Sequence, residues 1–589
     1  MSSSALKTID TRDVQYLHAV VDMGSNGIRF SISDLCPATQ RIMPTVFQDR
    51  AGISLYDAQF GSEGSTRRPI PDEVRDQIVS RLLRFKVTCE DFGVPAGNIQ
   101  ILATEATRTA PNSAEFRAAI YEATGWEITM LPKEEEGRIG GLGIASSLSR
   151  VEGLVMDLGG GSVQLSWMIF THESAEVESY PGGSISFPYG AAALTRRLDE
   201  AQKNGADAVR QLKDEMLHCF RGAVADLQLP PSLQAKLEGD GGLDLYLSGG
   251  GFRGWGYLLL SQSLINPYPI PILNGFSADR SQFLDTSAVI NTLSSESTIY
   301  GVSARRATQV PAVAFLVNVL AETIPSIKKI HFCQGGVREG ILFDKLPPQV
   351  RRNHPLVEAT SPFKTRSASE IALLLRQAIP DTNAAGNPYA PPPTITTTGF
   401  IEALANSMYI HSSVPRESYA AAALHSTTTG IIAYAHGLSH ADRAMLCLAL
   451  FDRWTGDVSP SDERFLQRLR EILTMQEAWW CQYIGRVAGL VGSIYPAGFI
   501  GSHTRISFMA RLSHRQTKKG ITKHLLSLVA NIPDSKNPSF DSDSVAAGLK
   551  KIKRTGKKGE YIRSSERIGL PQPGEEDWRL KVETDIYCV

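Results

Sequence analysis

One pattern occurs twice in this chain and constrains its fold more than any other feature. Residues 20–30 read VVDMGSNGIRF and residues 155–165 read VMDLGGGSVQL. Each copy has an apolar run, an aspartate, a turn of small residues and a second apolar run, which is typical of two β-strands joined by a turn. The repeat predicts two related lobes, each with a β-hairpin that carries an aspartate, Asp22 or Asp157, beside its turn.

Strand and helix patterns alternate through the first half of the chain. Apolar runs that end in glycines, LYLSGGG at 245–251 and IHFCQGG at 330–336, are typical of a strand that leads through a loop into a helix. Helical spacing of apolar residues predicts a helix over 72–92, and a helix-compatible start predicts another over 111–124. This alternation predicts an α/β fold.

The chain changes character after Leu346. Helical patterns at 401–408, 419–436 and 440–454 predict a mostly helical domain. A chain of 589 residues is also too long for one hydrophobic core. The expected parts are a first lobe, a second lobe, a helical domain and a C-terminal tail region, over 1–149, 150–346, 347–515 and 516–589.

The tail region contains a basic run, KKIKRTGKK at 550–558. Such a run is ordinarily a solvated surface. Nuclear localisation or contact with a polyanion is the alternative interpretation.

Composition excludes several classes of protein. Lys and Arg number 60 against 61 Asp and Glu, so the net charge of −1 gives no reason to expect direct contact with nucleic acid. The start lacks the apolar core of a secretory signal, and no apolar run approaches the roughly 18 residues of a membrane span. Seven scattered cysteines form neither a disulfide framework nor a zinc-binding pair. We therefore expect a soluble cytoplasmic protein that does not bind membranes.

Both repeated turns suit phosphate. The turns GSNG at 24–27 and GGGS at 159–162 are rich in glycine, which allows backbone N–H groups to approach an anion closely. The aspartate beside each turn suits Mg²⁺, which binds one or two carboxylates together with phosphate and water. A single glycine hairpin is more often an ordinary tight turn. Its repetition with the aspartate favours a phosphate site with Asp22 and Asp157 as metal ligands.

Two further segments carry charged groups that can take part in chemistry. Arg108 follows a buried strand pattern at 101–104, and an arginine there can bind phosphate bidentately or form an ordinary surface salt bridge. Three glutamates, 134–136, open a predicted helix, where acidic residues also stabilise the first turn through the helix dipole.

Taken together, these motifs resemble the exopolyphosphatase/guanosine-pentaphosphate phosphohydrolase (Ppx/GppA) family, over about residues 14–345. Within it, the chain is most similar to the fungal retrograde-regulation proteins. The resemblance implies two actin-like (ribonuclease H-like) ATPase lobes and a mostly helical C-terminal domain similar to a degenerate HD domain. The motifs that carry it are 21–30, 103–108, 135–138, 155–162 and 336–340.

The resemblance also implies roles for individual residues. Glu136 matches the catalytic base that activates water, and Asp157 matches the metal-associated aspartate. The positions that match phosphate contacts are Ser25, Asn26, Arg29, Arg108, Gly159, Gly160, Gly161 and Ser162, with Arg306 as a weaker candidate. The candidates for nucleotide contact are Gly249, Gly250 and Gly251.

The sequence departs from the family pattern at three places. Gln164 stands where a second acidic residue is common, seven positions after Asp157, so metal affinity is expected to fall. Gly27 replaces a residue that often carries a hydroxyl. The segment 403–407 lacks the histidine and acidic pair of an HD site, and the histidines at 411, 425, 436 and 440 are irregularly spaced, so no second metal site is expected there.

Three functions remain open at this stage. The cleft binds polyphosphate, ATP or another nucleotide and changes which surface is offered to regulatory signalling proteins in mitochondria-to-nucleus retrograde signalling. Alternatively, the chain is an active Mg²⁺-dependent exopolyphosphatase or phosphoanhydride hydrolase with Glu136 as base. A sugar or glycerol kinase is the third, although no acceptor motif is present. Homodimerisation is left open.

Overall fold

The computed structural model describes residues 13–60, 67–171, 176–239, 241–295, 299–324, 326–381, 387–396, 398–516, 522–533, 541–556 and 578–588. These residues form two compact units. The first comprises residues up to Leu259 together with Phe276–Arg352, and the second comprises Leu260–Gly275 together with the chain from Asn353 onward. Each is described by itself below.

The first lobe of unit 1 is a five-stranded sheet with the order β3-β2-β1-β4-β5. β1 and β2 are the predicted hairpin and β2 and β3 are also antiparallel, whereas β4 runs parallel to β1 and β5 parallel to β4. In the hairpin, Asp22 lies directly opposite Arg29. The strands are β1 (Leu17–Gly24), β2 (Gly27–Asp34), β3 (Thr45–Ala51), β4 (Ile99–Ala103) and β5 (Ile128–Met130).

The second lobe repeats this arrangement. β6 and β7 form the second predicted hairpin, in which Asp157 lies opposite Gln164, and β10 and then β12 follow β6 in parallel. The two sheets therefore share one strand order around their hairpins, which confirms the predicted α/β fold with two actin-like lobes. The strands are β6 (Val151–Leu158), β7 (Val163–Phe170), β8 (Glu178–Ser179), β9 (Ile185–Phe187), β10 (Leu243–Ser248), β11 (Ser277–Asp279) and β12 (Ile327–Phe332).

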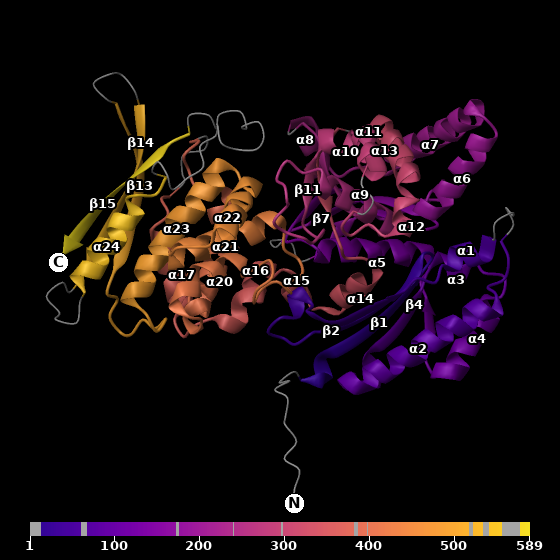
Figure 1. The fold of residues 1–589 in the computed structure, drawn as a ribbon, viewed down its shortest axis with the longest axis horizontal. Coiled ribbons are helices and arrows are strands. Elements are labelled where there is room, and N and C mark those ends of the chain that lie inside the picture. Colours follow the sequence, from indigo (N-terminus) through magenta and orange to yellow (C-terminus); the bar gives the residue numbers. More distant parts are fainter. Residues whose placement is uncertain are drawn as a thin grey trace, which may run out of the picture. The chain divides into compact units, whose positions relative to one another are not determined.

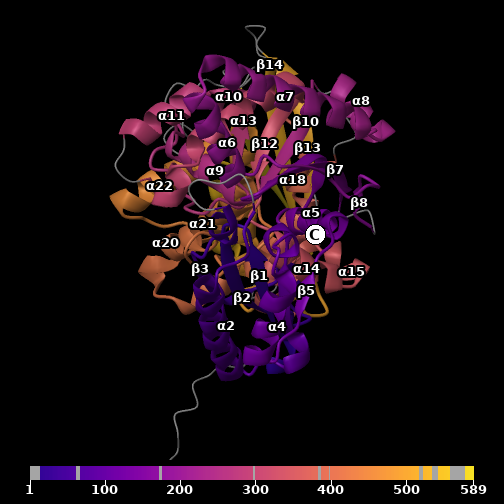
Figure 2. The same ribbon diagram turned by 90° about the vertical axis from the view of Figure 1, so that its right-hand side faces the viewer.

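Helices cover both sheets where the sequence places apolar faces inward. α2 (Asp72–Phe92) has the predicted bounds and ends at Gly93, whose positive φ of 71° terminates the helix. α4 (Ser113–Thr124) packs beside it on one face of the first sheet, as Figures 1 and 2 show. The main helices of the second lobe are α6 (Ala191–Lys203), α7 (Ala206–Asp226), α9 (Gly250–Ser261) and α13 (Val310–Thr323).

Two helices, α5 (Lys133–Ser146) and α14 (Val337–Lys345), lie side by side between the lobes (Figure 1). Their backbones meet at glycines: a Cβ built on Gly340 would lie 1.9 Å from the Ile139 carbonyl oxygen, and one on Gly143 would lie 2.3 Å from the Gly336 oxygen. Since no side chain fits at these positions, the two helices cross in backbone contact. This crossing holds α5, whose first turn carries Glu136, close against α14.

Unit 2 is largely helical, as predicted, and is built around the packed pair α21 and α23. Among the described residues, no group of three or more His, Cys, Asp or Glu side chains is placed to hold a metal ion. The principal helices are α16 (Pro355–Thr360), α17 (Ala368–Gln377), α19 (Thr398–Ser407), α20 (Tyr419–His425), α21 (His440–Trp454), α22 (Pro460–Ile472), α23 (Met475–Ile494) and α24 (Ser542–Ile552).

The predicted helix over 419–436 is wrong in length, because α20 ends at His425. The next residues are serine and threonines, whose hydroxyls bond nearby carbonyls and so compete with helical hydrogen bonds. The buried Arg443 guanidinium donates to the carbonyl oxygens of Thr427 and Ala435 at 2.5 Å each. The segment therefore wraps around an arginine instead of continuing as a helix.

A three-stranded sheet follows the helices, and the sequence patterns did not predict it. β14 pairs antiparallel with β13 and parallel with β15. Of the expected tail region, 517–521, 534–540 and 557–577 lie outside the described residues, as does part of the basic run at 550–558. The strands are β13 (Ser507–Gln516), β14 (Thr522–Ile532) and β15 (Leu580–Cys588).

The segment 260–275 contributes to the core of unit 2. The Tyr268 hydroxyl lies 2.9 Å from His440 Nδ1, and His440 Nε2 lies 3.0 Å from the Ile272 carbonyl oxygen. A carbonyl can only accept, so Nε2 carries the proton and Nδ1 accepts from the tyrosine. Burial lowers the pKa of His440 to about 3 and keeps it neutral. No helix in the described parts of the chain is both long and apolar enough to span a bilayer.

Candidate functional site

The two hairpins meet at one cleft of about 580 Å³ inside unit 1. Their turns approach closely: a Cβ on Gly160 would lie 2.6 Å from the Asn26 amide carbon, so a side chain at this position would displace Asn26. The arrangement brings together most of the predicted site residues, whose roles stay predictions. Those that line the cleft are Asp22, Ser25, Asn26, Arg29, Glu136, Asp157, Gly159, Gly160, Gly161, Ser162, Gly249, Gly250 and Arg306.

Two predicted site residues are not among those that line the cleft. The Arg108 guanidinium donates instead to the Leu131 carbonyl oxygen and, at 3.3 Å, to Glu136 Oε2. It therefore helps to orient the Glu136 carboxylate. Gly251 packs against the end of β6 within the second lobe, where a Cβ would lie 2.4 Å from Leu158 Cδ2. The geometry therefore gives Arg108 an indirect role and Gly251 a packing role.

The second turn presents backbone donors to the cleft. The carbonyl oxygens of 159–161 accept hydrogen bonds of 2.9 to 3.1 Å from the N–H groups of 190–192 at the start of α6. In a trans peptide the N–H points opposite to the C=O of the same unit. The N–H groups of Gly160, Gly161 and Ser162 therefore point away from α6, on the side of the turn that lines the cleft. Backbone N–H groups that face one side of a turn are suited to binding an anion.

The first turn is held by an arginine from the opposite lobe. Arg305, on α12 (Ala304–Ala307), donates to Asn26 Oδ1 at 2.9 Å and to the Asn26 carbonyl at 3.3 Å, and it also bonds Asp57. Because a guanidinium only donates, Oδ1 is the accepting atom and the amide Nδ2 is left as a donor. Asn26 is thereby fixed in an orientation that suits an anionic ligand.

Positive charge is concentrated along the cleft. Among the cleft arginines, the sequence predicted site roles for Arg29 and Arg306 only. Arg338 falls inside the 336–340 motif, but no role was assigned to it, nor to Arg50, Arg253 or Arg305, which come from β3, α9 and α12. Arginine suits phosphate because its planar fork matches two oxygens at once. The six arginines that line the cleft within the described residues are Arg29, Arg50, Arg253, Arg305, Arg306 and Arg338.

Electrostatics show that these arginines repel one another. Burial first, and then the positive charges of Arg253, Arg50 and Arg29, lower the pKa of Arg306 to about 10. Burial and neighbouring arginines also lower the pKa of Arg50. A lowered arginine pKa means that the charged form is disfavoured, so an anion in the cleft would relieve this repulsion.

The cleft also contains a pair of buried carboxylates. Burial raises the pKa of Asp22 and of Asp157, the nearby Arg29 lowers both, and the Asp22 charge raises the pKa of Asp157 further. Arg29 Nη1 lies 3.8 Å from Asp22 Oδ2. Two neighbouring buried carboxylates fit the ligands of Mg²⁺, which takes few protein ligands and completes its shell with phosphate and water. Gln164 lines the same cleft and can orient water.

Glu136 is a largely buried carboxylate with a raised pKa. It lies in the first turn of α5, and its side chain is 14% exposed. Burial raises its pKa to about 7, although Arg108 lowers it and the Asp22 and Asp157 charges raise it. A carboxylate that titrates near neutral pH is suited to taking a proton from water.

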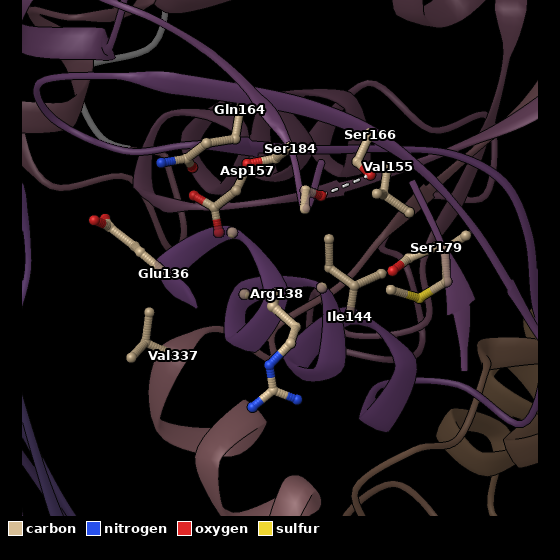
Figure 3. Close-up of a pocket in the computed structure, with 15 residues that line it drawn as sticks. Glu136, Arg138, Ile144, Val155, Asp157, Gln164, Ser166, Ser179, Ser184 and Val337 are labelled. Atoms are coloured by element: carbon tan, nitrogen blue, oxygen red, sulfur yellow. Dashed lines mark hydrogen bonds between the residues drawn. The ribbon is translucent and has the colours of Figure 1, made fainter. Parts of the chain in front are cut away.

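A second, smaller cavity of about 60 Å³ adjoins the cleft. Glu136, Asp157 and Gln164 line both, and Figure 3 shows their side chains together at one end of this cavity. Its far walls come from α5, β7 and the turn at 183–184.

Comparisons with known proteins agree with this geometry. Residues 36–349 match the model of the Ppx/GppA phosphatase family. The chain belongs to the Ppx/GppA phosphatase family. Within this family it is a homologue of Retrograde regulation protein 2 from Saccharomyces cerevisiae, to which it is 38% identical over 538 residues, covering 89% of this chain and 88% of the yeast protein. Residues 354–586 match the RTG2 C-terminal domain.

The first unit of this Ppx/GppA protein also resembles bacterial family members. Exopolyphosphatase 1 of Mycobacterium tuberculosis H37Rv is 26% identical over 349 residues, covering 58% of this chain and 91% of the bacterial protein. The crystal structure of the Aquifex aeolicus Ppx/GppA family member is 20% identical, with a TM-score of 0.42, and the match covers 56% of this chain and 97% of that one.

Proposed function

We propose that the interlobe cleft binds the phosphate chain of polyphosphate or of a nucleoside polyphosphate. The observation that carries the proposal is that six arginines and the glycine-rich turn at 159–162 line one cleft. Charge-assisted hydrogen bonds from arginines are the strongest contacts available to phosphate oxygens. A long polyanion satisfies several arginines at once, which a single phosphate cannot do.

The region after β10 favours the phosphate chain over an adenine ring. Trp255, which could have provided an apolar floor for a base, is fully buried in the core. Gly250 and Arg253 from the same helix face the cleft instead. A surface with a helix N-terminus and an arginine attracts anions more than a flat aromatic ring.

The biological role that we propose is retrograde regulation, in common with the yeast relative whose name states it. Ligand binding between two lobes can shift the balance between open and closed forms, and so change the surface offered to a regulatory protein. Arg305 supports this proposal, because it bonds Asn26 and Asp57 across the cleft. A polyanion that engages these groups would alter that contact.

Hydrolysis of the terminal phosphoanhydride is a second candidate function, favoured by Glu136. Its raised pKa, about 7, and its bond to Arg108 suit a base held in position. Glu136 would take a proton from water as the water attacks the terminal phosphorus, while the N–H groups of the turn at 159–162 hold the phosphoryl oxygens. Asp22 and Asp157 would hold Mg²⁺, which supplies charge neutralisation on the phosphate oxygens when bound.

The test uses the full-length protein with polyphosphate chains of defined length, ATP and GTP. Isothermal titration calorimetry measures binding, and a phosphate-release assay with and without Mg²⁺ measures turnover. We expect binding of polyphosphate that weakens steeply with salt, because several arginines are neutralised. The absence of binding to every phosphate chain would refute the first proposal. Turnover that is unchanged in Glu136→Gln would refute the second.

A further inference from the structure

The small cavity beside the cleft, here called the side chamber, lies against a face of α5 that carries three glycines. Gly137, Gly140 and Gly141 line it on the helix side, and Ser166 and Met168 of β7 line it on the sheet side. Figure 3 shows α5 below the cavity with Ile144 and Val155 away from the cleft end. Glycine within a helix is unfavourable compared with alanine, so the open space has a cost in helix stability.

Two observations indicate that the chamber is a genuine void with a polar wall. Gly140 is buried, yet a Cβ built on it meets no atom within 4 Å. The Ser184 hydroxyl, which also lines the chamber, is buried and has no hydrogen-bond partner among the described residues. A buried hydroxyl without a partner is costly unless water bonds it. A cavity of about 60 Å³ has room for water.

Charge decides what the chamber can hold. Asp157 and Glu136 stand at its boundary with the cleft, and both repel phosphate. Arg138 is the cation among the described lining residues, and its guanidinium is engaged by the carboxylates of Glu135 and Asp344. These charges disfavour a phosphate group in the chamber, whereas neutral water can occupy it.

We propose that the side chamber holds and delivers the water that attacks the terminal phosphorus, with the Ser184 hydroxyl as one of its anchoring groups. In-line displacement requires the nucleophile to approach from the side opposite to the leaving chain. The chain fills the cleft, so the free side of the terminal phosphorus is the side of the chamber. Glu136 borders both spaces and can accept the proton.

The step balances without any further reactant. The water oxygen forms a bond to the terminal phosphorus, and one water proton goes to the Glu136 carboxylate. The bond between that phosphorus and the bridging oxygen breaks, and its electron pair leaves with the shortened chain. The products are orthophosphate and a chain one phosphate shorter. This inference rests on the proposed hydrolysis and adds to it the origin of the water and a positioning role for Ser184.

Filling the chamber from Gly140 tests the proposal. Gly140→Ala places a methyl group where no atom lies within 4 Å, and Gly140→Leu fills more of the space. The control for the change of a helical glycine to alanine is Gly222→Ala at an exposed position of α7, where a Cβ also meets nothing within 4 Å. We expect Gly140→Leu to lower kcat by about 100-fold, the cost of displacing a reacting group, with KM and polyphosphate affinity unchanged. Gly140→Ala should show a smaller loss and Gly222→Ala none.

Ser184→Ala provides a second variant that keeps the volume of the chamber. It should lower kcat without changing KM, and a high-resolution crystal structure of the wild-type protein should show ordered water on Ser184 Oγ. If the wild-type protein turns over but circular dichroism shows folded Gly140→Leu and Gly140→Ala with full kcat, the chamber does not supply the water. If the wild-type protein binds polyphosphate and releases no phosphate under any condition, the hydrolysis itself is refuted and the chamber's role with it.

Discussion

The guanidinium of Arg305 in the second lobe lies 2.6 Å from the carboxylate of Asp57 in the first lobe and also holds Asn26. The lobes are thus joined at the edge of the cleft by a contact that a polyanion can compete for. Asp57 is 61% exposed, so the ion pair by itself is weak. A weak contact at this place suits repeated opening and closing.

Removing either partner of this contact should change the release of ligand, in opposite directions. We expect Asp57→Asn to lower the dissociation rate of polyphosphate about two- to fivefold, the value of an exposed ion pair, because no carboxylate then competes for Arg305. Arg305→Ala should raise the dissociation rate, because the cleft loses a positive charge. Stopped-flow displacement measures both rates, and equal rates in the wild type and both variants would show that polyphosphate does not compete for this contact.

Loss of the proposed base should separate turnover from binding. Glu136→Gln is expected to lower kcat by about 10²- to 10⁴-fold, the usual contribution of general-base catalysis, and to leave polyphosphate affinity similar. Glu135→Gln is the matched control, since Glu135 neighbours Glu136 but is engaged by Arg138. Phosphate release and calorimetry are the measurements. A comparable loss in both variants would point to damage to α5 rather than to loss of a base.

The raised pKa of Glu136 should appear in the pH dependence of turnover. A base must be deprotonated, so kcat should rise with pH up to about 7, the pKa of Glu136, and level off above it.

The free energy of unfolding should change with pH in the opposite direction. The folded state holds the proton above the ordinary pKa of 4.5, so stability falls as pH rises from there through about 7. Chemical denaturation between pH 4.5 and 8 should show a flatter profile for Glu136→Gln, and an identical slope would mean that this carboxyl is not perturbed.

Arg306 should contribute to binding at a cost in stability. Its charge is opposed by burial and by neighbouring arginines. Arg306→Gln should therefore raise the Tm of the ligand-free protein and weaken polyphosphate binding about tenfold or more, the value of a hydrogen bond to a charged group. Arg210→Gln, an exposed arginine paired with Asp207, serves as control. Differential scanning fluorimetry and calorimetry check the two effects, and a lowered Tm would contradict the repulsion.

The crossing of α5 and α14 should tolerate no added methyl group. Gly340→Ala places a Cβ 1.9 Å from the Ile139 oxygen, so we expect a loss of about 1–3 kcal/mol in the free energy of unfolding, typical of overpacking. Turnover should fall as well, because the displaced residue Ile139 belongs to α5, which carries Glu136. Urea denaturation measures the first effect, with Gly222→Ala as the control. An unaltered midpoint would show that the helices can move apart freely.

The sequence predicted what depends on neighbouring residues. The hairpins of Asp22 and Asp157 were recognisable because a strand, a turn and a second strand are contiguous, and α2 was recognisable from its helical spacing. The sequence therefore also indicated a cleft between the turns of the two hairpins, and both turns line it. The family resemblance supplied Glu136, which its own helix context would have explained as a stabilised first turn.

Other features depend on residues far apart in the chain and left no local signal. Arg50 and Arg253 come together only when β3 and α9 meet at the cleft. Arg108 follows its strand as predicted, yet its bond to Glu136 depends on where α5 begins. The pairing of β14 with β15 joins Thr522–Ile532 to Leu580–Cys588, which are far apart in the chain.

The excursion of residues 260–275 into unit 2 has a consequence for dividing the protein experimentally. A fragment that begins at Asn353 would leave the imidazole of His440 without its tyrosine and carbonyl partners. A fragment that ends at Arg352 would carry sixteen foreign residues in the middle of its second lobe. Because unit 2 is built from two separate stretches of the chain, a single cut cannot yield either unit intact.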